Sequence, residues 1–156
     1  MNPDKFMRRA IALADANVSA GRGGPFGAVI VRDGTIVAEG TNLVTSANDP
    51  TAHAEVVAIR NACRALGTFR LSGCEIYASC EPCPMCFGAV YWARLDRLCF
   101  AAGRLDAERA GFDDRFIYEE LGTALDARRI PTMQLLADPG RVVLERWRVT
   151  PDKIDY

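Results

Sequence analysis

The order of hydrophobic and polar positions predicts a helix at the start of the chain. Pro3 suits the first turn of a helix, and the glycine-rich segment 21–25 would end it. Between these points apolar residues recur at helical spacing, at Phe6, Ala10, Leu13, Ala14 and Val18. We therefore expect an amphipathic first helix that buries these five side chains.

Short apolar runs bounded by turn residues predict strands in the rest of the chain. The five expected strands cover residues 26–32, 35–42, 74–79, 97–101 and 132–137. Asp33-Gly34 joins the first two, and this dipeptide is typical of a tight hairpin turn. The chain is therefore predicted to contain one hairpin followed by three separate strands.

Helical patterns alternate with the later strands. The expected helices cover residues 52–66, 84–93, 114–121 and 139–147, with polar loops at 45–50 and 103–111. Strands that alternate with helices pair in parallel and carry helices on both faces of the sheet. We therefore predict an α/β fold, a three-layer α/β/α domain with a five-stranded mixed sheet, and a single domain over residues 1–156.

Composition narrows the class of protein. The hydrophobic fraction of 49% and charged fraction of 25% are ordinary for a soluble globular domain. The net charge of −1 makes nucleic acid an unfavourable partner, because a nucleic-acid binder usually carries a basic excess. Neither the first residues nor any later run has the apolar length of a signal peptide or membrane span. We therefore expect a cytoplasmic protein whose six cysteines serve packing and metal binding.

Three residues have the types and spacing of a zinc site. Cys83 and Cys86 form a Cys-x-x-Cys pair at a predicted helix start, where the helix dipole favours thiolates. His53, the only histidine, can supply a third ligand. Sulfur with imidazole favours zinc, and three protein ligands leave the fourth position open for water. Glu55 lies two residues from His53 and would move protons beside the metal, so the pattern indicates a zinc deaminase.

Two other interpretations of these cysteines remain open. Cys80 could join the three ligands in a closed, purely structural zinc site. An isolated Cys-x-x-Cys could also be a redox pair. A structural site would not require Glu55, and a redox pair would not require the His-x-Glu partner, so both are less favoured than a hydrolytic site.

The chain resembles the cytidine deaminase-like superfamily at these motifs, and its other segments resemble the short bacterial guanine deaminases. The segments that carry the second resemblance are 24–29, 48–55, 79–86 and 110–114, together with Trp92. The resemblance implies that His53, Cys83 and Cys86 bind zinc and that Glu55 is the proton shuttle. It also implies a substrate-binding role for Asn42, Ala54 and Asp114.

The chemistry of guanine agrees with Asp114 in this role. Guanine presents N1–H and an amino group side by side, and one carboxylate can accept hydrogen bonds from both. Cytosine and adenine place a ring acceptor next to the amine, so a carboxylate would repel them. The neighbouring Asp113 is a plausible helix cap, which is compatible with substrate recognition by Asp114.

Three aromatic residues are further candidates for the site. Phe26 and Trp92 could form walls for a flat purine, although core packing explains each equally well. Tyr156 ends a polar tail that would ordinarily fray. In related guanine deaminases the C-terminal segment closes an active site, in some cases that of a partner subunit. The resemblance therefore implies a homodimer in which residues 149–156 act as a lid or a domain-exchanged tail.

The sequence thus predicts hydrolysis of guanine to xanthine and ammonia by a zinc enzyme of purine metabolism. One alternative is a related deaminase acting on guanosine, an aminated triazine, cytosine or tRNA adenosine. A second alternative, from another class, is a non-catalytic binding module stabilised by zinc.

Overall fold

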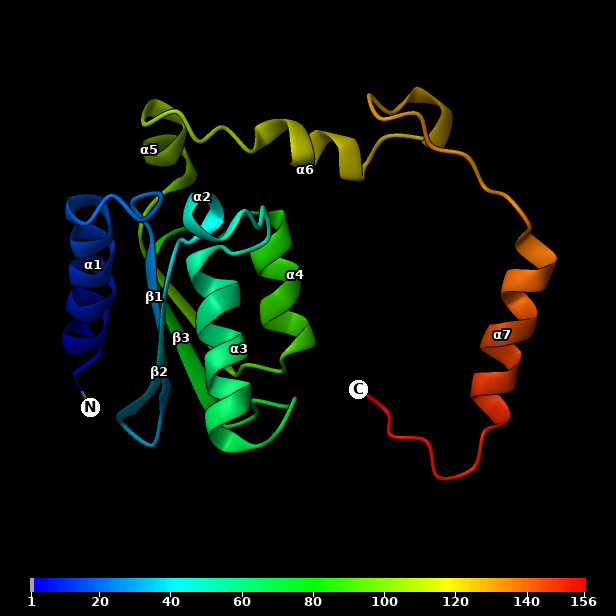
Figure 1. Ribbon diagram of the computed structural model, residues 1–156, viewed down its shortest axis with the longest axis horizontal. Helices are drawn as coiled ribbons and strands as arrows, with labels where there is room; N and C mark the ends of the chain where they lie inside the picture. Colours follow the sequence, from blue (N-terminus) through cyan, green and yellow to red (C-terminus); the bar gives the residue numbers. More distant parts are fainter. Residues whose placement is uncertain (1) are drawn as a thin grey trace. The chain divides into compact units, whose positions relative to one another are not determined.

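A mixed four-stranded sheet organises the first part of the chain (Figure 1). The computed structural model describes residues 2–156. Its strands are β1 (Gly27–Arg32), β2 (Thr35–Thr41), β3 (Cys74–Cys80) and β4 (Arg97–Ala102). They lie in the order β2-β1-β3-β4, with β1 antiparallel to both neighbours and β3 parallel to β4. The predicted hairpin and the predicted parallel pairing are both confirmed.

Helices cover both faces of this sheet. On one face α1 (Asp4–Ser19) packs against β1, β2 and β3. On the other face α3 (Ala54–Leu66) packs against β1 and β2, with α4 (Pro84–Trp92) beside it (Figure 1). The arrangement is the expected α/β/α layering.

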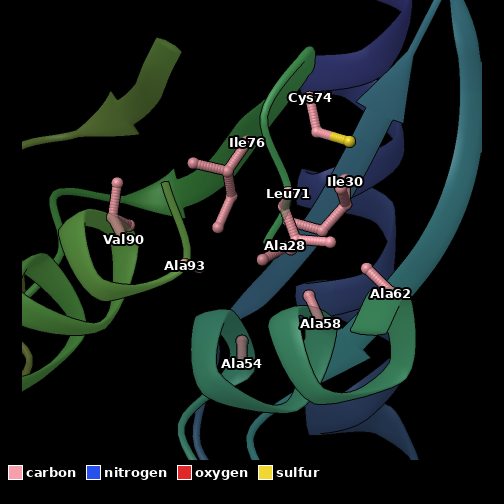
Figure 2. Close-up of a cluster of buried hydrophobic side chains, with 10 residues drawn as sticks. All are labelled: Ala28, Ile30, Ala54, Ala58, Ala62, Leu71, Cys74, Ile76, Val90 and Ala93. Atoms are coloured by element: carbon pink, nitrogen blue, oxygen red, sulfur yellow. The ribbon is translucent and has the colours of Figure 1, made fainter. Parts of the chain in front are cut away.

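Small side chains bring α3 close to the sheet. Ala54, Ala58 and Ala62 recur every four residues on α3 and face Ala28 and Ile30 of β1 (Figure 2). All five side chains are fully buried. The spacing of four residues places the alanines on one helix face, and their small size allows a close approach.

Gly40 of β2 permits the closest approach between the sheet and α3. A Cβ atom at this position would lie 2.3 Å from the Ala54 carbonyl oxygen and 2.4 Å from the Ala58 amide nitrogen. Both neighbours are backbone atoms, so any side chain here would force the helix away from the strand. Gly40 therefore fixes the position of the first turn of α3, which carries Glu55.

The buried face of α1 differs from the prediction at its C-terminal end. Phe6, Ala10 and Ala14 are buried as expected, but Val18 is 54% exposed and Asn17 is fully buried. Successive residues of an α-helix are separated by about 100°. Asn17 consequently lies near the centre of the face formed by Phe6, Ala10 and Ala14, and Val18 lies about a quarter turn away from it.

The loops of the first part contain two helices that the sequence did not predict. They are α2 (Val44–Ala47), which overlaps the expected loop 45–50, and α5 (Arg104–Arg109), which lies inside the expected loop 103–111. At the start of α5 the Gly103 amide donates to Asp106 Oδ2 (3.0 Å) and the Arg104 amide donates to Glu81 Oε2 (3.0 Å). The two carboxylates accept hydrogen bonds from amides that have no partner within the helix. The carboxylate of Glu81 comes from a segment that is distant in the sequence.

The chain divides into two compact units, Met1–Asp114 and Arg115–Tyr156. The second contains α6 (Arg115–Leu121), the 3₁₀ turn η1 (Leu125–Ala127) and α7 (Ala137–Val149). The predicted fifth strand at 132–137 is wrong, because residues 132–136 have no regular structure and Ala137 begins α7. A strand needs a neighbour for its backbone hydrogen bonds, and residues 115–156 contain no other strand.

Apolar side chains in this second unit are exposed. None of residues 115–156 is buried, and Ile130, Leu135 and Leu136 are 74% to 79% exposed.

Across residues 2–156, no helix has both the length and the apolar character needed to cross a membrane.

Candidate metal centre and active site

Two helix N-termini bring together the residues of the metal motif. His53 directly precedes α3, and Cys83 directly precedes α4, whose first residue is Pro84. Cys86 lies in the first turn of α4 and is fully buried. The unpaired amides at a helix start carry a partial positive charge, so both helices favour negatively charged groups here.

The distances in this cluster fit a zinc ion. His53 Nδ1 lies 3.6 Å from Cys83 Sγ and 3.5 Å from Cys86 Sγ. The three ligand atoms all lie within 4.8 Å of one another. In a tetrahedral zinc site with ordinary bond lengths, a nitrogen and a sulfur ligand are about 3.6 Å apart. The three side chains can therefore share one zinc ion and leave its fourth position free.

The pKa values of the two thiols are shifted in opposite directions by their mutual contact. Hydrogen bonding with Cys86 and then with His53 lowers the pKa of Cys83 to about 4, although burial acts in the opposite direction. The contact with Cys83, followed by burial, raises the pKa of Cys86. Hydrogen bonding with Cys83 also raises the pKa of His53. Without a cation the pair therefore favours a single thiolate, whereas a bound metal ion holds both sulfurs deprotonated.

A buried carboxyl group lies beside the metal ligands. Glu55 is only 7% exposed, and its Oε2 is 3.5 Å from Cys86 Sγ. Burial is the largest cause that raises the pKa of Glu55, and the negative charge of Cys83 adds to it. A carboxyl group whose pKa is raised in this way is suited to accept a proton and to release it again.

The orientation of the Asn42 side chain is fixed by two backbone amides. Asn42 is buried at the end of β2, and its Oδ1 accepts hydrogen bonds from Gly24 N and Val44 N, both 3.2 Å away. Because the oxygen is used in this way, the NH₂ group is the end of the amide that can donate to a ligand.

Asp114 and Phe26 lie in the same unit as the metal ligands. Asp114 is half-buried, and burial is the main cause that raises its pKa, with the charge of Cys83 second. The half-buried Phe26 packs edge-to-face on Phe112, with ring centroids 4.9 Å apart. The contact joins the segment before β1 to the segment that carries Asp114.

Other predicted site residues differ in exposure. Ala54 is fully buried between His53 and Glu55. Trp92, at the end of α4, is 64% exposed, so its ring is not a core side chain. Tyr156 belongs to Arg115–Tyr156 and is 69% exposed.

Two residues next to the site were not predicted. Phe112 belongs to the motif segment 110–114, and its contact with Phe26 becomes visible only in three dimensions. Asn17 contacts Asn42, with its Nδ2 2.9 Å from the Asn42 carbonyl oxygen. The sequence did contain a signal for Asn17, because it is a polar residue at the centre of an otherwise apolar helix face.

Known proteins resemble this chain in sequence and in structure. Residues 1–102 match the family described as the cytidine and deoxycytidylate deaminase zinc-binding region. The guanine deaminase of Bacillus subtilis is 53% identical over 156 residues, which is 100% of both chains. An X-ray structure of guanine deaminase from that organism has a TM-score of 0.96 at 52% identity, covering 100% of this chain and 99% of the other.

Similarity to a second class of deaminase is less extensive. The tRNA-specific adenosine deaminase of Aquifex aeolicus is 41% identical over 112 residues, or 71% of this chain and 72% of the relative. The matched sequence family, the fold and the cluster of His53, Cys83 and Cys86 agree with one another. This chain therefore belongs to the zinc-binding cytidine and deoxycytidylate deaminase family, with the cytidine deaminase-like α/β fold.

Proposed function

We propose that this protein is a zinc-dependent guanine deaminase that converts guanine and water to xanthine and ammonia. The observation that carries the proposal is a buried carboxyl group, Glu55, 3.5 Å from one of three clustered zinc-ligand side chains. That arrangement supports hydrolytic deamination, because zinc deaminases combine such a ligand set with a free glutamate. Guanine is favoured as the substrate because similarity to the Bacillus subtilis enzyme extends over the whole chain, whereas similarity to the tRNA enzyme covers 71% of it.

In the proposed reaction Glu55 moves the protons. Zinc held by His53, Cys83 and Cys86 supplies Lewis acidity, which makes water nucleophilic at neutral pH. The Glu55 carboxylate takes a proton from the water that adds to C2 of guanine, and delivers it to a ring nitrogen. It then carries the remaining proton of the added hydroxyl group to the amino group. The bond between C2 and this amino nitrogen breaks, ammonia leaves, and the hydroxyl oxygen becomes the C2 carbonyl oxygen of xanthine. The buried position of Glu55 favours its protonated form and so helps it to hold each proton between the two transfers.

Asp114 and Asn42 are proposed to recognise the base. Asp114 would accept hydrogen bonds from N1–H and the adjacent amino group, and the Asn42 NH₂ would donate to an acceptor on the ring. The charge of Cys83 influences the pKa of Asp114, which supports a position for Asp114 close to the metal ligands. Phe26, Trp92 and the backbone of Ala54 are proposed to line the same site.

Replacing Asp114 with asparagine should lower kcat/KM for guanine by about 10- to 100-fold, because a charged hydrogen-bond acceptor is lost. The asparagine would also direct an NH₂ group at a substrate donor. Steady-state ammonia release measures the effect. Asp113→Asn is the matched control, because it makes the same chemical change one residue away and should leave kcat/KM near the wild-type value. A larger loss of kcat/KM in Asp113→Asn than in Asp114→Asn would mean that Asp113, and not Asp114, recognises the base.

A substrate screen tests the proposed specificity. The purified zinc-loaded protein should release ammonia from guanine with a higher kcat/KM than from guanosine, cytosine, cytidine, adenine, an aminated triazine or tRNA. The physical reason is the donor pair of guanine, which suits a carboxylate. Faster turnover of cytidine or adenine would contradict the role of Asp114. An absence of ammonia from every substrate would favour the non-catalytic binding module.

We also propose that the chain functions as one deaminase domain in a homodimer, and that residues 149–156 act as a lid or a domain-exchanged tail. The proposal is supported by the exposed apolar side chains of residues 115–156. Val142, Leu144 and Val149 of α7 are 59% to 69% exposed. Exposed apolar groups on this scale usually mark a contact surface. In this arrangement residues 149–156 form a lid, with Tyr156 at its end.

Deleting residues 150–156 tests the lid. The truncated protein should show kcat/KM for guanine reduced by about fivefold or more, because loss of even one buried contact removes on the order of 1 kcal/mol of binding. Light scattering and zinc analysis should show the wild-type number of chains per assembly and the wild-type metal content. Unchanged turnover would contradict the lid, and a wild-type protein that is monomeric at working concentration would contradict the dimer.

A cytoplasmic location is the remaining part of the proposal. All six cysteines lie among the described residues and are free thiols, which suits a reducing compartment.

A further inference from the structure

A buried amide on α1 reaches the segment that holds Asn42. Asn17 is 0% exposed, and its Nδ2 donates hydrogen bonds to the carbonyl oxygens of Gly24 and Asn42, both at 2.9 Å. Since both neighbours are acceptors, the group that faces them must be the NH₂ end of the amide. Asn17 therefore ties the glycine-rich loop and the end of β2 to one point on α1.

The same segments also hold the Asn42 side chain. The Gly24 amide donates to Asn42 Oδ1, while the Gly24 carbonyl accepts from Asn17. Gly24 is thus bonded at both ends, and Asn17, Gly24 and Asn42 form a closed ring of hydrogen bonds. Gly23 allows this contact, because a Cβ atom there would lie 2.2 Å from the Asn42 carbonyl oxygen. The glycine-rich segment 21–25 therefore allows the backbone to lie close to Asn42.

A buried polar residue at this position has a cost for folding as well as two favourable contacts. Asn17 Oδ1 is buried and has no hydrogen-bond partner among residues 2–156. Burial of an unpaired polar atom opposes folding. The other residues on this helix face are apolar, as at Ala10 and Ala14. What distinguishes Asn17 is the pair of carbonyl groups held by its NH₂.

We propose that Asn17 is a positioning residue for substrate binding, which fixes the loop and the Asn42 backbone so that the Asn42 amide meets the purine base in one orientation. The inference rests on the proposed role of Asn42 in binding the base. The inference assigns the effect of Asn17 to its contacts with Asn42 and the adjoining loop, while Glu55 and Cys86 are carried by the separate helices α3 and α4. Removal of Asn17 therefore weakens the binding of guanine and leaves the proton transfers intact.

Kinetics of Asn17→Ala and Asn17→Ser test the inference. Asn17→Ala should raise KM for guanine by about threefold to tenfold and change kcat by less than about twofold, as expected for the loss of a ground-state contact. Asn17→Ser keeps one hydroxyl donor and should raise KM less than Asn17→Ala. Each substitution is also combined with Asn42→Ala. In that background the Asn17 variants should have no further effect, because the residue through which Asn17 acts is already gone.

Phe6→Leu serves as the control for a general loss of stability. Phe6 is on the same helix, and it packs in the cluster that contains Val29 and Tyr77. This variant should have a lower Tm and an unchanged KM, and all variants should bind zinc equally. A wild-type KM in both Asn17 variants overturns the inference. It is also overturned if the Asn17 substitutions raise KM by the same factor in the wild-type and the Asn42→Ala backgrounds. If Asn42→Ala itself leaves KM unchanged, the proposed role of Asn42 fails and the inference fails with it.

Discussion

Replacing Glu55 with glutamine should lower kcat for guanine by about 10²- to 10⁴-fold, which is the usual contribution of a general acid–base group. Glutamine keeps the shape and the burial of the side chain but cannot accept and release a proton. The zinc content should stay at the wild-type value, because Glu55 lies beside the ligand cluster without being one of its three members. KM should change little, since the lost function belongs to the transition state.

Protein stability provides a second readout for the same variant. Burial raises the pKa of Glu55, so the carboxylate is less favourable in the folded protein than in water. A neutral amide avoids this penalty, and zinc-free Glu55→Gln should have a Tm equal to or above that of the zinc-free wild type. Low activity combined with a higher Tm separates loss of chemistry from loss of fold.

Glu75→Gln is the matched control. Glu75 is near the start of β3, and its carboxylate accepts a hydrogen bond from the Tyr77 hydroxyl at 2.6 Å. The same chemical change at this position should leave kcat within about twofold of wild type, because Glu75 is near the start of β3 whereas Cys83 follows the other end of this strand. If Glu55→Gln retained more than a tenth of wild-type kcat, Glu55 would not be the proton shuttle. If it lost zinc, Glu55 would instead support the metal site.

The metal cluster was predictable because its members are short-range patterns. Cys83 and Cys86 are three residues apart at a helix start, and His53 and Glu55 are two residues apart at another. Local spacing therefore determined most of the relative geometry. The remaining step, the meeting of the two helix starts, follows from their position on one face of the sheet.

The incorrect predictions concern features that depend on distant residues. The apolar run 132–137 has the composition of a strand, but its own unit offers no neighbour for pairing. Helix α5 begins where Glu81, distant in the sequence, accepts a hydrogen bond from the Arg104 amide. Asn17 belongs to the same class, because its partners Gly24 and Asn42 lie outside the helix that carries it. Periodicity places a residue on a face but does not identify what that face contacts.

Replacing Cys86 with alanine should remove both zinc and activity. The change leaves two protein ligands, His53 and Cys83, and removes the Cys86 sulfur that lies 3.5 Å from His53 Nδ1. After dialysis against a chelator and reloading, the wild type should contain about one zinc per chain and the variant close to none. Ammonia release by the variant should fall to background, and added zinc should restore only the stripped wild type. The variant should also have a lower Tm, because metal that binds only the folded state contributes to its stability.

Cys80→Ala distinguishes an open catalytic site from a closed structural one. Cys80 is also buried near the cluster, but its Sγ lies 3.8 Å from the Gly103 carbonyl oxygen, and it is not among the three clustered ligands. This variant should keep its zinc and its activity and lose about 1 kcal/mol of stability from the small cavity. Equal loss of zinc in Cys80→Ala and Cys86→Ala would mean that four protein ligands close the site. A closed site has no position for water, so that result would remove the chemical basis for deamination.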